Sequence, residues 1–398
     1  MIEDYLALTA LGLYPSKKEW FFKYGKQGNE YEALLKHKKS NLTKIDLKTS
    51  EGSLYYNEKY ISTIMKDFYQ TQDIGFESIN HFAENFIEIM IFSEVEGTLE
   101  IEGIKTSKRK IEEVLKIKSD LSSKEQIIVN MKKGIDYIFE HDITEANLYE
   151  LYMILSEHSL TEDEKIESGY YRQNGVDIIG KYGEVSDRGV DAKHLTQWMN
   201  EFISFIQKQL ESLNSLTYLM PQLIHYYMIT LHPYYDFNGR MARMLAYWYI
   251  LKCPFIKNKM PIFSEAINYN AKTKALYYKA IEDAREDDND LTFFFDTMFD
   301  LGKKFLNVYL KLDALESKTR RTMNPLTKSE LNTLKSILLY INEKDFFTWE
   351  DVSFVDKEQY TKQYYLKLLN SLVDKDVLLK NIKGKIYYFQ VKEQVETF

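Results

Sequence analysis

Apolar residues recur at helical spacing along most of this chain. Between residues 57 and 92 they return every three to four positions, and they are densest over residues 82–92. Such a period places an apolar stripe along one side of a helix, where it can pack on a core. The same spacing predicts further helices over residues 107–119, 125–141, 145–158, 192–212, 217–231, 240–251, 269–285 and 290–315. The pattern therefore predicts a mainly α-helical fold.

Two segments break this pattern with short β-prone runs. Residues 170–180 carry a turn at residues 173–175, which predicts a hairpin. After a polar linker at residues 317–325, two helices are expected over residues 328–342 and 357–374, with a short helix between them. Residues 377–391 then have the pattern of strand, turn and strand. The chain is expected to combine a helical core with a short hairpin and a small C-terminal α/β module.

These patterns divide the chain into four parts. A polar segment, residues 1–56, has no assigned function, and its charge run at residues 36–40 is expected to be solvated. A helical region follows over residues 57–142, then a helical core over residues 143–316 and the C-terminal module over residues 326–398. At 398 residues with 44% hydrophobic content, the chain can bury a large core.

Composition narrows the class of protein. The net charge of −8 argues against broad binding to nucleic acid or membrane surfaces by the whole chain. The single cysteine, Cys253, excludes an internal disulfide and a cysteine-based zinc site. The N-terminus lacks the basic start of a signal peptide, and no run of about 18 apolar residues occurs. We therefore expect a cytoplasmic protein with no membrane partner.

Side chains suited to catalysis and to ligand binding are most concentrated in residues 232–243, between two apolar helical segments. Pro233 disfavours continuation of the first helix, which places His232 at its C-terminal end. Asn238 and Gly239 form a turn dipeptide, and the next helix is expected to start near Arg240. The free N–H groups and the dipole of that helix favour an anion in the loop.

Four side chains of this stretch suit phosphoryl or nucleotidyl transfer. Arg240 and Arg243 lie three residues apart on one helical face and can bind phosphate oxygens. Asp236 is a hard oxygen ligand suited to Mg²⁺, and His232 is suited to general-base work. Taken singly, His232 also fits the structural role of a helix-capping residue, and the two arginines also fit a solvated helix face. His225, inside the preceding apolar run, is expected to be a packed core histidine.

The stretch resembles the signature of the Fic family, His-Pro-Phe-x-Asp/Glu-Gly-Asn-Gly-Arg-x-x-Arg, and ten of its twelve positions fit. The family consists mostly of AMP transferases, which move AMP from ATP to a protein hydroxyl. The resemblance implies that His232 deprotonates the hydroxyl and that Asp236 holds Mg²⁺. It also implies that Asn238, Gly239 and Arg240 cradle the phosphates and that Arg243 meets the γ-phosphate.

Two positions depart from the family pattern. Tyr234 replaces phenylalanine, which keeps an aromatic ring below the loop. Phe237 replaces the first glycine, which restricts the backbone and adds volume in the pocket. The second departure leaves three interpretations of the protein open. The first is an AMP transferase. The second is a Fic-fold protein with another phosphate-linked donor or with de-AMPylation activity, and the third is a non-catalytic regulator that senses nucleotide.

A segment upstream of the signature resembles the target-docking flap of the family. Residues 168–172 are similar to its Gly-x-Tyr-Arg segment, and residues 176–180 follow as the flap. The resemblance implies that Arg172, Val176 and Ile178 help to dock an extended target by strand addition. The target is then a protein hydroxyl, and self-modification stays open because the chain has 31 tyrosines.

Residues 98–103 resemble the inhibitory motif of the family, Ser/Thr-x-x-x-Glu-Gly/Asn, in members whose inhibitory helix precedes the core. Thr98 and Glu102 stand four residues apart on one helical face, and Gly103 is a natural helix stop. The inhibitory helix is expected near residues 93–103, with Glu102 pairing with Arg243. Glu96-Gly97 offers a rival register, although Phe92 rather than Ser or Thr stands four residues before Glu96.

The C-terminal module resembles, in pattern alone, the winged-helix tails of many Fic proteins. Its Lys and Arg residues balance its Asp and Glu residues, whereas a DNA-binding domain usually has a basic face. Lys362 and Lys367 on the second long helix, with Lys380, Lys383 and Lys385 near the turn, could form one. DNA binding and protein contact or homo-oligomerisation both stay open for this module.

Overall fold

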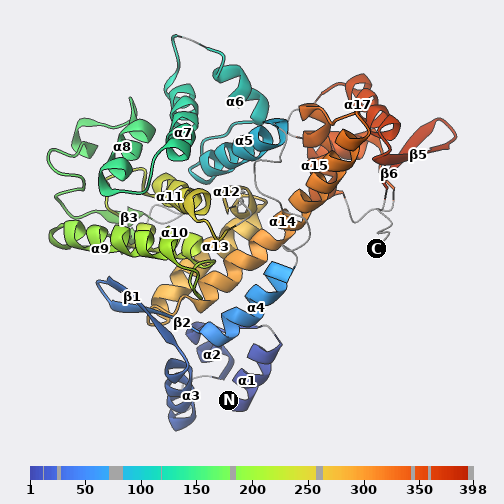
Figure 1. The fold of residues 1–398 in the computed structure, drawn as a ribbon. Helices are drawn as coiled ribbons and strands as arrows, with labels where there is room; N and C mark the ends of the chain where they lie inside the picture. The colour runs from blue at the N-terminus through green and yellow to red at the C-terminus, as the bar shows by residue number, and fades with distance from the viewer. Residues whose placement is uncertain are drawn as a thin grey trace.

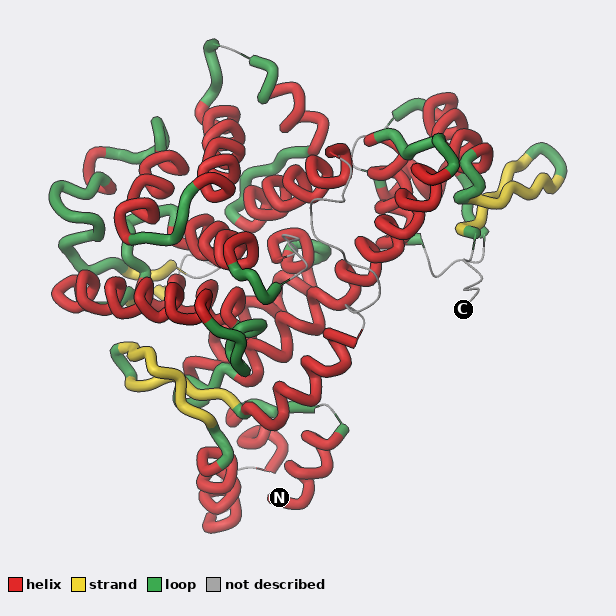
Figure 2. Tube along the Cα trace, in the orientation of Figure 1, coloured by secondary structure: helices red, strands yellow, loops and turns green. Residues whose placement is uncertain are grey.

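The computed structural model describes residues 1–11, 13–24, 28–70, 84–117, 119–179, 185–256, 263–341, 346–356 and 360–392. Helices dominate them, and the only strands in these residues form three two-stranded antiparallel hairpins (Figures 1 and 2). The predicted fold class, a mainly α-helical chain with small hairpins, is therefore confirmed. In the described part of the chain no helix is both long enough and apolar enough to cross a membrane.

The elements follow one another in a simple order. The N-terminal region holds α1 (Ile2–Ala10), α2 (Lys17–Tyr24), α3 (Gly28–Ser40), β1 (Thr43–Thr49) and β2 (Gly52–Tyr56). Next come α4 (Glu58–Gln70), α5 (Glu84–Ile101), α6 (Lys108–Val114), α7 (Ser123–Glu140), α8 (Glu145–Ser156) and a 3₁₀ turn (Glu162–Glu164). The core continues with β3 (Asp177–Ile179), β4 (Val185–Arg188), α9 (Ala192–Glu211), α10 (Met220–Leu231), α11 (Asn238–Lys252), α12 (Phe263–Ile267), α13 (Ala271–Glu286) and α14 (Thr292–Arg321). The C-terminal module consists of α15 (Lys328–Tyr340), α16 (Trp349–Val355), α17 (Lys362–Asp374), β5 (Leu378–Lys383) and β6 (Ile386–Val391).

Helices α10 and α11 form the centre of the core. Both are apolar on nearly every face, and almost all of their residues are buried. A helix that is apolar all round must be surrounded by protein, and Figure 1 shows α7, α9, α13 and α14 around this pair. The loop that joins them, residues 232–237, is consequently held by two rigid elements.

Several predicted boundaries were wrong, and one of them is the end of the helix predicted over residues 107–119, which is α6 and stops at Val114. The hairpin lies at β3 and β4, paired as Asp177 with Arg188 and Ile178 with Asp187, so the Asn-Gly turn precedes both strands. Helix α14 runs on to Arg321 through much of the expected linker, because Leu315 and Thr319 are buried on it and extend its packed face. The predicted helix over residues 57–92 is found as α4 and α5, and residues 71–83 between them lie outside the described residues.

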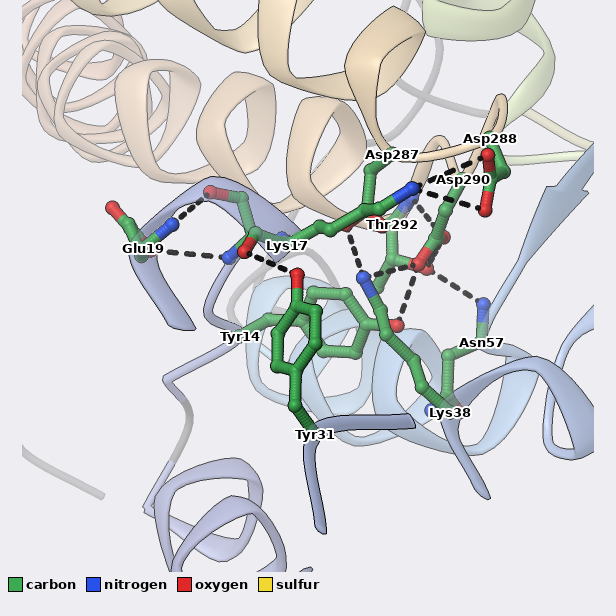
Figure 3. A network of polar contacts seen from close by, with 11 residues as sticks. Tyr14, Lys17, Glu19, Tyr31, Lys38, Asn57, Asp287, Asp288, Asp290 and Thr292 are labelled. Carbon is green, nitrogen blue, oxygen red and sulfur yellow. Dashed lines mark hydrogen bonds and ion pairs between the residues drawn. The ribbon is translucent and has the colours of Figure 1, made fainter. Parts of the chain in front are cut away.

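In the charge run at residues 36–40, Lys36 and Lys39 are exposed as predicted, but Lys38 is only 4% exposed and the prediction was wrong there. Its ammonium group contacts Asp287 and lies 3.0 Å from Asp290, in the turn between α13 and α14 (Figure 3). Tyr14 donates a hydrogen bond of 2.7 Å to Asp290. A buried charge is tolerated when carboxylates surround it, and these partners lie about 250 residues away, where a local pattern cannot reveal them. The N-terminal region is thus anchored to the core.

Candidate functional site

His232 ends α10 in a left-handed backbone conformation, with φ 50° and ψ 59°. Its backbone N–H still donates to the carbonyl of Met228 at 3.0 Å, so the last helical turn is closed. On the side chain, Nδ1 lies 3.3 Å from the carbonyl oxygen of Ile229. A carbonyl only accepts, so this contact assigns the proton to Nδ1 and the basic lone pair to Nε2. His232 therefore has the tautomer that a general base acting through Nε2 requires.

Asn238 holds the loop in shape. Its Oδ1 accepts from the backbone N–H of Tyr234 at 3.0 Å, and its Nδ2 donates to the carbonyl of Tyr234 at 2.8 Å. Asn238 was expected to help to cradle phosphates, and these two bonds use its side chain to close the loop. What Asn238 offers an anion is its backbone N–H, in the first turn of α11, where N–H groups have no partner inside the helix.

Phe237 stands at the start of α11 with φ 70° and ψ 1°, a left-handed conformation that costs a non-glycine residue energy. The loop backbone therefore keeps a shape suited to glycine, although a phenylalanine occupies the position. The ring is 2% exposed, and the guanidinium carbon of Arg240 lies 3.4 Å from its centroid. The phenylalanine ring therefore fills the space beneath Arg240. The cation–π contact between the ring and the guanidinium group offsets part of the energy of the strained backbone.

Arg240 is 6% exposed, and its Nε and Nη1 have no hydrogen-bond partner among the described residues. Burial lowers its pKa from the ordinary value, although Asp236, 3.4 Å from Nη2, opposes this effect. Buried guanidinium donors without acceptors are costly, since proteins satisfy nearly all such groups. An oxyanion is the group that would satisfy them, so the arrangement fits a phosphate.

Asp236 carries the carboxylate that a metal ion would need. Its side chain is 49% exposed, and Oδ1 accepts from the backbone N–H of Phe237 at 2.5 Å. Within the described residues no group of three or more His, Cys, Asp or Glu side chains is placed to hold a metal. This donor set suits Mg²⁺ bound through one carboxylate and substrate phosphates, and it does not suit a metal held by protein ligands alone.

Arg243, 3% exposed, meets both residues of the predicted inhibitory motif. Its Nε donates to Thr98 Oγ1 at 2.5 Å, and its Nη2 contacts Glu102 Oε1. Burial alone would raise the pKa of Glu102, but the charge and hydrogen bond of Arg243 together with the charges of Arg240 and Lys274 outweigh it, and the pKa is lowered. The pair is consequently charged at neutral pH. Thr98 and Glu102, expected on one helical face, are brought together at this arginine.

Gly239 makes room for the Glu102 carboxylate. A β-carbon on residue 239 would lie 2.7 Å from Glu102 Oε1 and 3.3 Å from Arg243 Nη1. Glu102 therefore lies against the first turn of α11, where the helix dipole favours a negative charge. The carboxylate of α5 occupies the kind of position that the phosphate of a ligand would take.

The rival pair, Glu96 and Gly97, has a different task. A β-carbon on Gly97 would lie 2.7 Å from the backbone carbon of Ser264, so this glycine lets α5 approach α12 closely. Glu96 is 8% exposed and lines the side of α5 that faces α15. Of the two glutamates, Glu102 is the one that reaches Arg243.

Arg172 was predicted in the target-docking flap, yet it is only 1% exposed. Its guanidinium donates to the carbonyl oxygens of His232 at 2.7 Å, Asn174 at 2.6 Å and Val190 at 2.5 Å. Such a residue cannot face a target. The fork of guanidinium donors instead fixes the carbonyl of His232 and ties the loop to the flap.

The other predicted flap residues lie beside this clamp. Ile178 pairs with Asp187 across the hairpin, and the carbonyl of Val176 accepts from the N–H of Gly189 at 3.0 Å. Both side chains are partly exposed. Among the described strands, β3 and β4 pair only with each other, and Gly189 directly after β4 lies close to His232, because a β-carbon on it would stand 3.2 Å from His232 Cβ.

Tyr235 and Tyr152 support the loop, and sequence reasoning missed both. The Tyr235 hydroxyl accepts from the backbone N–H groups of Gln173 at 3.1 Å and Asn174 at 3.3 Å. Tyr152 stacks on Tyr234, with ring centroids 4.0 Å apart. Only the aromatic run at residues 234–235 hinted at such contacts. His225 is a core residue as predicted, with Nε2 2.7 Å from Tyr277 Oη and a pKa lowered by burial to about 3.

Several solved structures are similar to this chain. Solved structures that resemble the chain include a Fic family protein from Desulfovibrio desulfuricans, with 16% identity, a TM-score of 0.47, and coverage of 84% of this chain and 94% of that one. Another is Fic-1 from C. elegans, with 15% identity, a TM-score of 0.48, and coverage of 78% and 92%. A Fic domain-containing signalling protein from Bacteroides thetaiotaomicron has 16% identity, a TM-score of 0.45, and coverage of 63% and 95%.

The sequence is similar to one relative and to one family model. The chromosomal replication initiator protein DnaA of Mesoplasma florum is 32% identical over 73 residues, which span 18% of this chain and only 15% of that relative. The family model described as Fic/DOC family matches residues 142–250, which include the whole loop from His232 to Arg243. This segment of the chain is therefore similar to the domain of the Fic/DOC family.

Proposed function

We propose that this protein is an autoinhibited nucleotidyltransferase that moves AMP from ATP to a hydroxyl group of a protein. Fic domain proteins generally transfer phosphate-linked groups such as AMP to proteins. One observation carries the proposal for this chain. A base, two buried arginines and a helix N-terminus converge on one loop, and the Glu102 carboxylate already lies on Arg243.

The chemistry assigns one task to each group. The acceptor hydroxyl gives its proton to His232 Nε2 while its oxygen forms a bond to the α-phosphorus, and the bond to the β-phosphate oxygen breaks, releasing pyrophosphate. The N-terminus of α11 and the unsatisfied donors of Arg240 stabilise the phosphate charge. Mg²⁺, where bound, would be held by Asp236 together with phosphate oxygens and would neutralise developing charge.

The target segment is proposed to add to the β3–β4 hairpin beside the loop. Main-chain hydrogen bonds at a strand edge bind an extended peptide without regard to its sequence. Arg172 joins the segment before this hairpin to the carbonyl of His232, so a docked hydroxyl is held at a fixed distance from the base.

Inhibition follows from competition between two anions. Glu102 occupies Arg243 and the space beside Gly239, so ATP phosphates meet a carboxylate where they need a cation. Like charges repel strongly in a partly buried site, and the nucleotide is held away from a productive pose. Phe237 favours a second candidate within the same chemistry, a different phosphate-linked donor, because its ring fills space beneath Arg240.

The test is label transfer from α-phosphate-labelled ATP with Mg²⁺. Wild type, Glu102→Gly, and Glu102→Gly combined with His232→Ala are compared for label in protein. Strong labelling of Glu102→Gly that disappears in the combined variant supports the proposal. Absence of label in Glu102→Gly, with ATP bound, contradicts AMP transfer and directs the search to other donors.

A further inference from the structure

Helix α5 is held on two opposite faces. Thr98 and Glu102 project toward Arg243. At about 100° per residue, Ser93, Gly97 and Glu100 lie on roughly the other side of the helix. That side faces α12 and the C-terminal module (Figure 1), and these three residues line a cavity there of about 180 Å³. The helix that places Glu102 thus has the catalytic loop on one side and the C-terminal module on the other.

Lys335 is the main contact from the module. It belongs to α15 and is only 1% exposed, which is unusual for a lysine. Its ammonium donates to Ser93 Oγ at 2.7 Å and lies 2.5 Å from Glu265 Oε1 on α12. Tyr309 on α14 donates to the other oxygen of Glu265 at 2.8 Å. One buried cation therefore joins the module to α5 and α12 together.

Lys328 adds a second link to α5. It lies 2.9 Å from Glu88 on α5, contacts Glu112 on α6, and places its ammonium 4.3 Å from the ring centroid of Phe92. Between the two lysines lies the cavity, lined also by Lys108, Asn332 and Tyr340. The junction is therefore fixed by charged contacts around a space that is not filled by side chains.

Displacement of α15 carries a high cost at this junction. It would leave Glu265 buried without its cation, and burial of an unpaired charge is much more costly than burial of a pair. Burial lowers the pKa of Lys335 to about 7 even with Glu265 beside it, which shows how closed the site is. The positions of α15, α12 and α5 are consequently coupled.

We propose that the C-terminal module is the regulator of the inhibitory contact: through Lys335 it holds α5 where Glu102 reaches Arg243, and displacement of the module releases the site. The inference rests on the proposed function, because it assigns the control of that same inhibition. A partner that binds the module acts on the transferase through this helix and need not touch the catalytic loop.

The test neutralises the buried pair in one step. Lys335→Met combined with Glu265→Gln removes both charges, so neither charge is left unpaired. The double change is made in two backgrounds, the wild-type protein and the Glu102→Gly variant. In wild type we expect label transfer to rise at least about fivefold, the lower range of allosteric coupling. In Glu102→Gly the same pair of changes is expected to alter transfer by less than about twofold, because the contact that it releases is already absent.

Hydrogen exchange of the peptide covering residues 93–103 and ATP affinity are measured on the same proteins. Both are expected to rise with the Lys335→Met/Glu265→Gln change. Unchanged exchange, or faster exchange with unchanged transfer and affinity, overturns the inference. An equal rise of transfer in both backgrounds also overturns it, because the effect then bypasses Glu102. If Glu102→Gly itself transfers no label, the proposed function fails, and exchange and affinity still decide the coupling.

A matched control lies inside the module. Lys375, at the end of α17, and Glu330 on α15 form a buried pair 2.7 Å apart, and within the described residues this pair makes no hydrogen bond or ion pair with α5. Lys375→Met with Glu330→Gln is expected to leave transfer unchanged, and an equal rise there would contradict a specific role for Lys335. If the Lys335 variant does not fold, Ser93→Ala, which removes one acceptor from Lys335, is expected to raise exchange and transfer in the same direction.

Discussion

The Glu102 carboxylate lies so close to Gly239 that a β-carbon on residue 239 would stand 2.7 Å from its Oε1. The same β-carbon would lie 3.3 Å from Arg243 Nη1. Glycine therefore leaves beside the first turn of α11 a space that one anionic group can enter. In the structure the carboxylate of the protein enters it, and under the proposed function this is how a single glutamate competes with the phosphates of a nucleotide.

Phe237 gives a prediction about backbone strain. Phe237→Gly and Phe237→Ala both lose the buried ring and should both be less stable than wild type. Only glycine relieves the left-handed conformation at φ 70°, so Phe237→Gly should be the more stable of the two by about 1 kcal/mol. Chemical denaturation of both variants measures the difference. Equal stability, or a more stable alanine variant, would show that the loop has another conformation.

Arg172 is predicted to position His232 without contacting substrate. Arg172→Lys keeps the charge but loses the fork of donors, so transfer in the Glu102→Gly background should fall at least about tenfold while ATP affinity changes little. The matched control is Arg320→Lys on α14, away from the loop and the hairpin, whose side chain is 47% exposed and pairs with Glu316. A loss shared equally by both variants would argue against a specific role for Arg172.

The sequence could identify helices and the candidate catalytic loop, residues 232–237, because both have local signals. A period of three to four residues predicted α7, α8, α9 and α15 to within a few residues at each end, and His232 and Arg243 stand within one short stretch. Thr98 and Glu102 could be chosen because their four-residue spacing places them on one face of a helix.

What the sequence could not predict depends on partners far along the chain. Lys38 belongs to a polar run, and only the fold brings Asp287 and Asp290 to it. Arg172 looked like a flap residue because nothing nearby shows that its acceptors are carbonyl oxygens at positions such as 190 and 232. The Asn-Gly dipeptide at residues 174–175 is a strong local turn signal, yet the hairpin forms after it.

Lys38 leads to a prediction about the anchor of the N-terminal region (Figure 3). Lys38→Met leaves Asp287 and Asp290 buried side by side without their cation, which should cost about 3–5 kcal/mol of stability. Lys17→Met is the control, since Lys17 lies 3.5 Å from an exposed Asp288 and should cost less than about 1 kcal/mol. Thermal unfolding distinguishes the two, and similar midpoints for both variants would contradict the anchor.

Glu94 on α5 predicts a pH dependence. Burial raises its pKa from 4.5 to about 7, so folding favours the protonated form. Its contribution to stability is fully present below pH 4.5 and is lost as the pH rises through about 7. Glu94→Gln stays neutral, so its stability relative to wild type should increase between pH 5.5 and 8, by roughly 2 kcal/mol. A constant difference across this range would show that Glu94 is already ionised at pH 5.5.

Under the proposed function, Glu102 and no other carboxylate of α5 restrains the transfer of AMP. The most direct measurement compares label transfer from α-phosphate-labelled ATP by Glu102→Ala and Glu96→Ala, two identical changes on one helix. The contact between Glu102 and Arg243 predicts that Glu102→Ala raises transfer at least about tenfold and that Glu96→Ala stays near wild type. A rise in Glu96→Ala with no change in Glu102→Ala would contradict the account.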